Sequence, residues 1–127
     1  MKHAPQIAAG LLGLLFVVFG LNFFLKFIPI PSPPEGSPPA MFMGAMFMTG
    51  YLAFIKVFEI VGGVLVAIPK TRNIGLLVLG PVIVNILAFH AFMTGGAGFK
   101  DPVVILITIL SLFLLWTGRK SFKGLLN

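Results

Sequence analysis

The apolar positions of this chain gather in four long runs, which short polar or proline-rich connections separate. A membrane-crossing helix needs about 20 mainly apolar residues, because a rise of ~1.5 Å per residue must cover a hydrocarbon core of ~30 Å. The four runs are near that length and cover residues 6–28, 48–68, 74–93 and 102–118. The pattern predicts an all-α fold, an integral membrane four-helix bundle that forms a single domain over residues 1–127.

Composition agrees with lipid as the solvent of these helices. Of the 127 residues, 58% are hydrophobic and only 9% are charged, against about 25% charged in an ordinary soluble domain. The chain has no cysteine, which excludes disulfides, thiol redox chemistry and cysteine-ligated metals. The net charge of +6 is spread over short flanks and forms no patch, so we expect no nucleic-acid partner.

The distribution of charge between the connections predicts the orientation of the bundle. Basic residues lie at the N-terminus, in the connection after the second run and at the C-terminus: Lys2, Lys70, Arg72, Arg119, Lys120 and Lys123. The other connections carry only Glu35, Lys100 and Asp101. Because basic loops stay on the cytoplasmic side, we predict an inner (plasma) membrane protein with both termini cytoplasmic, N-in/C-in.

The first run could also be read as a cleaved signal peptide. Its apolar core is longer than the usual h-region of about 7–15 residues, and no clear small-x-small cleavage site follows it. We therefore expect a retained span.

The two connections on the predicted outer side differ in character. The segment "IPIPSPPEGSPPA" is proline-rich, so we expect an extended loop without helix. The segment "MTGGAGFKDP" is glycine-rich, and its last two residues, Asp101 and Pro102, are suited to begin the fourth helix.

The second run, "YLAFIKVFEIVGG", places Lys56 and Glu59 inside an apolar helix. A charge at the centre of a span costs about 2.5–3.5 kcal/mol on insertion scales. At positions i and i+3 the two side chains share a helix face and can neutralise each other. Gly63 follows on this face and leaves room for a neighbouring helix.

Further polar groups lie at a similar depth in the neighbouring runs. Asn22 and Lys26 share a face of the first helix, while Asn85 and His90 lie in the outer half of the third. The candidate ligand-binding residues are therefore Asn22, Lys26, Lys56, Glu59, Asn85 and His90. Two interpretations remain open: polar groups that only fix helix packing, or a binding site with an apolar cavity that reaches Glu59.

Other motifs add little chemistry. The segment "MFMGAMFM" resembles a methionine-rich copper motif, but no single helix face presents all four sulfurs, so we predict no metal site. The chain shows no phosphate-binding loop, no nucleophile–histidine–acid constellation and no paired carboxylates. These features favour a protein without a catalytic centre of its own.

Three segments resemble the DoxX-like family of small four-helix bacterial membrane proteins. They are "GLLFVVFGLNFFLKFIPIP", "TGYLAFIKVFEIVGGVLV" with the following "PKTR", and "GLLVLGPVIVNILAFHAF". The resemblance implies a four-helix membrane fold. It also implies a link to quinol-oxidising or other redox complexes, or to the assembly of other membrane proteins.

Residues and resemblance together favour a protein that binds an amphipathic small molecule, either a quinone or a lipid, or a partner membrane protein. The alternative is a quinone-reactive accessory subunit of a membrane redox complex, in which Glu59 relays protons. A quinone is thus the one cofactor considered, and membrane lipid, another membrane protein or a second copy of the chain are the expected partners. A small transporter would need a water-filled path, for which four short helices leave little room.

Overall fold

The computed structural model describes residues 3–126, and within them the chain is all-α. Its helices are α1 (Ala4–Leu25), α2 (Pro38–Thr49), α3 (Tyr51–Ala67), α4 (Arg72–Ala88), α5 (Pro102–Thr117) and α6 (Arg119–Lys123). Short 3-10 turns lie at η1 (Pro69–Thr71) and η3 (Ala97–Lys100), and a π-helical turn, η2 (Phe89–Met93), extends α4.

By length and composition, two of these segments could cross a membrane. They are α1 and the continuous helical stretch Pro69–Met93, and a third exists if α2 and α3 are counted as one bent span. The fourth predicted span, α5, is apolar but has only 16 residues. The all-α class and the apolar helices of the prediction are confirmed, with bounds that differ by a few residues from those expected.

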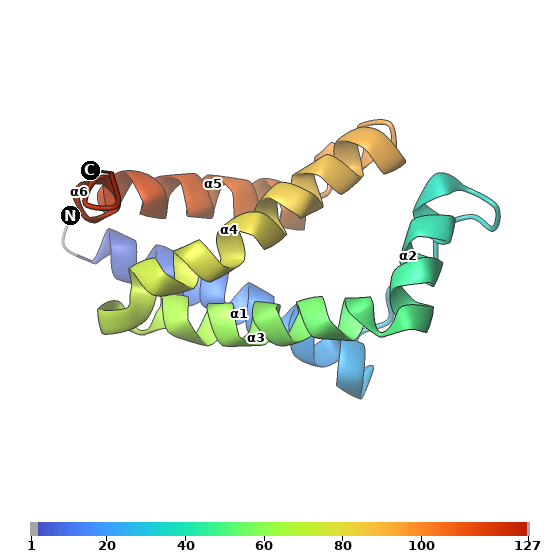
Figure 1. Cartoon of the computed structure of the whole chain (residues 1–127), viewed down its shortest axis with the longest axis horizontal. Helices are drawn as coiled ribbons and strands as arrows, with labels where there is room; N and C mark the ends of the chain where they lie inside the picture. Colours follow the sequence, from blue (N-terminus) through green and yellow to red (C-terminus); the bar gives the residue numbers. More distant parts are fainter. Residues whose placement is uncertain (1–2, 127) are drawn as a thin grey trace.

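Helix α3 packs against α1 and α4, and α5 packs against the same two helices (Figure 1). The fully buried side chains of the core are Leu12, Val66, Leu79 and Leu114. Apolar side chains such as Leu14, Val84 and Ile109 are more than half exposed. Exposed apolar side chains over most of the surface are expected where the outer solvent is lipid.

Glycines allow the three long helices to approach closely. A Cβ built on Gly13 of α1 would lie 2.5 Å from the Gly63 carbonyl of α3. On the other side of α3, a Cβ built on Gly75 of α4 would lie 2.5 Å from the Val66 nitrogen. The room that the sequence predicted beside Gly63 is therefore filled by α1, as expected for small residues at membrane helix interfaces.

The expected second span, residues 48–68, is broken at Gly50. This glycine has φ +84°, a conformation that side-chain-bearing residues rarely adopt, and α2 and α3 meet there at 86°. Helix α2 begins inside the segment expected to be an extended loop. Ser37 is its N-cap and accepts a hydrogen bond from the Ala40 nitrogen, while Pro38 fits the first turn, where no N–H is needed.

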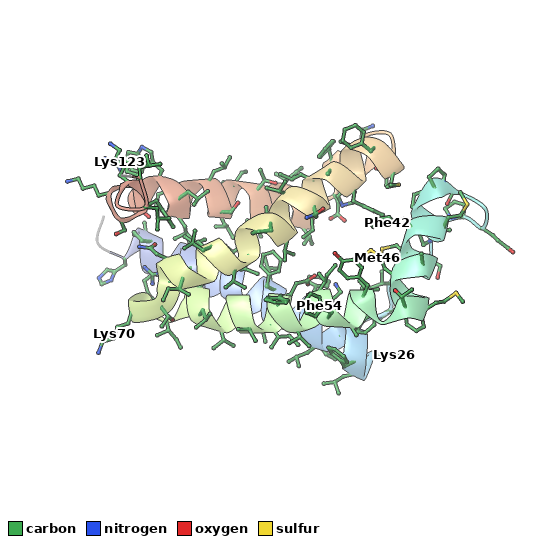
Figure 2. The ribbon with its side chains drawn as sticks, viewed as in Figure 1. Lys26, Phe42, Met46, Phe54, Lys70 and Lys123 are labelled. Carbon is green, nitrogen blue, oxygen red and sulfur yellow. The ribbon has the colours of Figure 1, made fainter. Side chains whose placement is uncertain are left out.

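No residue of α2 is buried, yet aromatic contacts tie it to its neighbours. The rings of Phe42 and Phe89 lie 5.7 Å apart, and those of Phe23 and Phe47 lie 5.9 Å apart. Figure 2 shows Phe42 and Met46 on the side of α2 that faces the rest of the bundle. Helix α2 therefore lies across one end of the bundle.

The start of α1, the end of α6 and the turn η1 lie together at one end of the bundle, which we call the terminal end (Figure 1). We call the other end, with the loop after α1 and the loop between η2 and α5, the loop end. Figure 2 shows Lys70 and Lys123 at the terminal end and Lys26 at the loop end. The predicted start of α5 is confirmed, because the Asp101 side chain accepts a hydrogen bond from the Val103 nitrogen.

Candidate functional site

The Lys56 and Glu59 side chains form an ion pair within α3. Lys56 Nζ lies 3.4 Å from Glu59 Oε1, and the two side chains are 21% and 8% exposed. Helix geometry brings positions i and i+3 together, as the spacing predicted. This is the one salt bridge among residues 3–126, and it lies inside an apolar helix.

Glu59 lies on the inward face of α3, together with Leu52, Gly62 and Val66. On the neighbouring helix, Gly20 lies against Lys56: a Cβ built on it would be 3.2 Å from the Lys56 carbonyl oxygen. Helix α1 therefore passes the ion pair at close range. The carboxylate lies within the bundle and not on its outer surface.

Asn22 and Lys26 belong to the end of α1 and make no polar contact with the ion pair in the described structure. Asn22 is buried, donates from Nδ2 to the Ile28 carbonyl at 3.0 Å and accepts from the Ile28 nitrogen at 2.7 Å. Lys26 adopts the left-handed conformation, with φ 56°, that ends the helix. Its backbone N–H donates to the Asn22 carbonyl. Asn22 thus holds the chain where it turns back after α1.

Asn85 and His90 also have local surroundings. Asn85 is exposed, and its Nδ2 donates to the Pro81 carbonyl of its own helix at 2.8 Å. The Nδ1 of His90 is buried with no hydrogen-bond partner in the described residues, and the ring packs against Gly98. The loop binds the His90 carbonyl, through the Gly96 nitrogen and the Thr94 hydroxyl.

Two surface grooves are evident in the described structure. One lies between α1 and α3 and includes Gly13, Gly63 and Ala67, while the other lies near Leu87 and Thr108. Neither includes Glu59 or Lys56. Neither groove is therefore the cavity that the sequence predicted at Glu59.

A polar network that the sequence reading missed lies at the terminal end. Arg72 donates from Nε to the Val66 carbonyl at 3.3 Å and from Nη2 to Gln6 Oε1. Gln6 in turn donates to the Ala67 carbonyl, and the Thr71 hydroxyl donates to the Leu65 carbonyl. These carbonyls belong to the last turn of α3, where helical partners are lacking. The signal in the sequence was the group of polar residues flanking two apolar runs.

The described residues contain no group of three His, Asp or Glu side chains that could hold a metal ion. Figure 2 shows Met46 on the side of α2 that faces the bundle, whereas Met48 is 85% exposed. The geometry therefore leaves the Lys56–Glu59 pair as the chemically distinctive feature of the described helices.

Comparison with known proteins gives one informative relative. No family model matches the chain, and no solved structure does. The chain is 36% identical to "Uncharacterized protein YwoB" of Bacillus subtilis (strain 168) over 130 aligned positions, which cover 98% of this chain and 82% of the relative. Similarity of this extent along the whole chain shows common descent, and the chain belongs to the same family as YwoB.

Proposed function

We propose that this chain is a four-helix integral membrane protein that binds the polar head of an amphipathic small molecule, a quinone or a lipid, beside the Lys56–Glu59 pair. The observation that carries the proposal is the incomplete pairing of two charges inside an apolar helix. Glu59 uses one carboxylate oxygen and Lys56 one of its three N–H donors in the single hydrogen bond between them. Among the described residues, no other hydrogen bond involves either side chain.

Unused hydrogen-bonding capacity is costly where water is scarce. An ammonium group with free N–H donors suits an oxygen acceptor, such as a quinone carbonyl or a lipid ester or phosphate. The neighbouring apolar residues of α3 would hold the hydrophobic part of such a ligand. Asn22 and Asn85 already bind backbone carbonyls, so they support the helices around the site rather than the ligand itself.

The helices fit a membrane if α1, α3, α4 with η2, and α5 each cross it. With α3 along the membrane normal, the 86° bend puts α2 close to the membrane plane, where its exposed Phe and Met side chains suit the interface. Helix α3 has 17 residues and a length of ~25 Å, so the bilayer thins slightly around it or flanking residues reach the headgroups. This arrangement corresponds to the DoxX-like resemblance and to an inner-membrane protein with cytoplasmic termini.

The test is to identify what copurifies with the protein in mild detergent. Lipid extraction and mass spectrometry of the wild type should reveal a quinone or a defined lipid. The double variant Lys56→Met/Glu59→Gln should copurify with at least about tenfold less of this molecule, a difference equivalent to one charge-assisted hydrogen bond. The double variant removes both charges together, so no unpaired charge is left. Lys100→Met/Glu35→Gln removes the same two charges from exposed positions at the loop end and serves as the control. Equal recovery of every lipid and quinone from all three proteins contradicts the proposal.

A further inference from the structure

The groove between α1 and α3 is an apolar channel on the side of the bundle, with a volume of about 310 Å³. It is bounded by Gly10, Gly13 and Val17 on α1, by Gly63 and Ala67 on α3, and by Ile68, which directly follows α3. The tight contact of Gly13 with the Gly63 carbonyl forms its floor. At Gly10 the side is open, because a Cβ built there would meet no atom within 4 Å.

The terminal end of this groove is polar and positive. Gln6, one helical turn before Gly10, donates to the carbonyl of Ala67 and accepts from Arg72. Arg72 uses two of its five N–H donors in hydrogen bonds to Gln6 and to the Val66 carbonyl. Lys70 is exposed and follows the groove residue Ile68 by two positions (Figure 2).

We propose that the groove holds one acyl chain of an anionic phospholipid, whose phosphate lies at Lys70 and Arg72. The dimensions fit this occupant. From Gly10 to Val17 the groove runs ~10 Å along α1, and one leaflet of the hydrocarbon core is ~15 Å thick. A chain that starts at the polar end therefore follows the groove for most of the depth of its leaflet.

Charge also favours an anionic headgroup. Within residues 3–126, the terminal end carries five basic residues and no acidic one. The basic residues are Lys70, Arg72, Arg119, Lys120 and Lys123. Each basic residue near an anionic bilayer surface strengthens the attraction by roughly fivefold. This site is at the opposite end of α3 from α2 and does not involve the Lys56–Glu59 pair. It is therefore independent of the ligand proposed above and rests only on the proposed membrane arrangement.

The experiment titrates the delipidated protein with phosphatidylglycerol or with phosphatidylcholine of the same chains, and native mass spectrometry measures the bound lipid. We expect the wild type to bind phosphatidylglycerol about fivefold more tightly. Lys70→Gln should remove most of this preference. Gly10→Leu should weaken the binding of both lipids, because the new side chain fills the groove without touching the α1–α3 contact. Two controls should behave as wild type: Lys100→Gln, the last residue of the other 3-10 turn, and Gly44→Leu, a helical glycine with open space on α2.

Several results would overturn the proposal. Equal affinity for the two lipids would show that the site does not select an anionic headgroup. Unchanged lipid binding by the Gly10→Leu variant would show that no acyl chain lies in the groove. If Gly10→Leu instead dissociates a dimer and leaves lipid binding intact, the occupant is a second copy of the chain. If soluble glycerol phosphate competes as well as the whole lipid, the site takes a phosphate without a chain. The Lys56→Met/Glu59→Gln variant should keep its phosphatidylglycerol preference, which separates this site from the proposed one.

Discussion

At the scale of single residues, the Lys56–Glu59 pair has two consequences that can be separated, one for stability and one for binding. The Glu59 side chain is buried and the Lys56 side chain is about a fifth exposed, so each charge depends on the other more than in a surface pair. Their mutual hydrogen bond is long at 3.4 Å, which leaves the pair open to a stronger partner.

Removing one member of this pair should destabilise the protein. Glu59→Gln or Lys56→Met alone leaves an uncompensated charge inside the bundle, at a cost of about 3 kcal/mol, the low end of the range for buried pairs because Lys56 is partly exposed. The double variant should recover part of this loss. Thermal unfolding of the four proteins in one detergent measures the coupling, and single losses that simply add would show that the two side chains act independently.

The sequence was sufficient to predict this pair, because an i,i+3 spacing in a helix fixes the geometry without any knowledge of the fold. It was not sufficient for Asn22, Asn85 or His90. Periodicity indicates which way a side chain leaves its helix, but Asn22 and Asn85 bind backbone carbonyls of their own segments. His90 packs on Gly98, a contact set by the path of the loop that follows η2.

At the scale of elements, glycines determine how closely α1, α3 and α4 pack. Gly75→Ala should destabilise the protein by about 1–3 kcal/mol, because its Cβ would lie 2.5 Å from the Val66 nitrogen and backbone must move. Gly10→Ala is the matched control, since its Cβ enters open space and alanine favours a helix interior. Unfolding temperatures of the two variants provide the comparison. A Gly75→Ala variant as stable as Gly10→Ala would mean that the α3–α4 contact is loose.

The elements that the hydrophobic pattern predicted best are those with long, unbroken apolar runs, namely α1, α4 and α5. The pattern failed at α2, because apolar residues continue across Gly50 while the backbone turns by 86°. The helix start at Ser37-Pro38 was hidden among prolines that were read only as helix breakers. Both features depend on single backbone conformations, to which a count of apolar residues is insensitive.

At the scale of the whole molecule, the structure joins the basic segments at one end of the bundle. The loop end carries Lys26, Glu35, Lys100 and Asp101, whose charges cancel, whereas the described part of the terminal end carries five positive charges. The start of α1, the end of α6 and η1 lie together there, as the four antiparallel crossings proposed above require (Figure 1). This charge difference between the ends gives the proposed direction of insertion a physical basis.

The direction of insertion can be tested with single cysteines, since the natural chain has none. Ser32→Cys and Ala97→Cys lie in the two exposed loops of the loop end, and Ser121→Cys lies exposed in α6 at the terminal end. Positive segments remain in the cytoplasm, so a membrane-impermeant maleimide added to intact cells should label the first two and label the third only after the membrane is opened. All three positions are exposed, so differences in reactivity report membrane side and not burial. Labelling of Ser121→Cys alone in intact cells would reverse the proposed orientation, and would also move the Lys70–Arg72 lipid site to the outer leaflet.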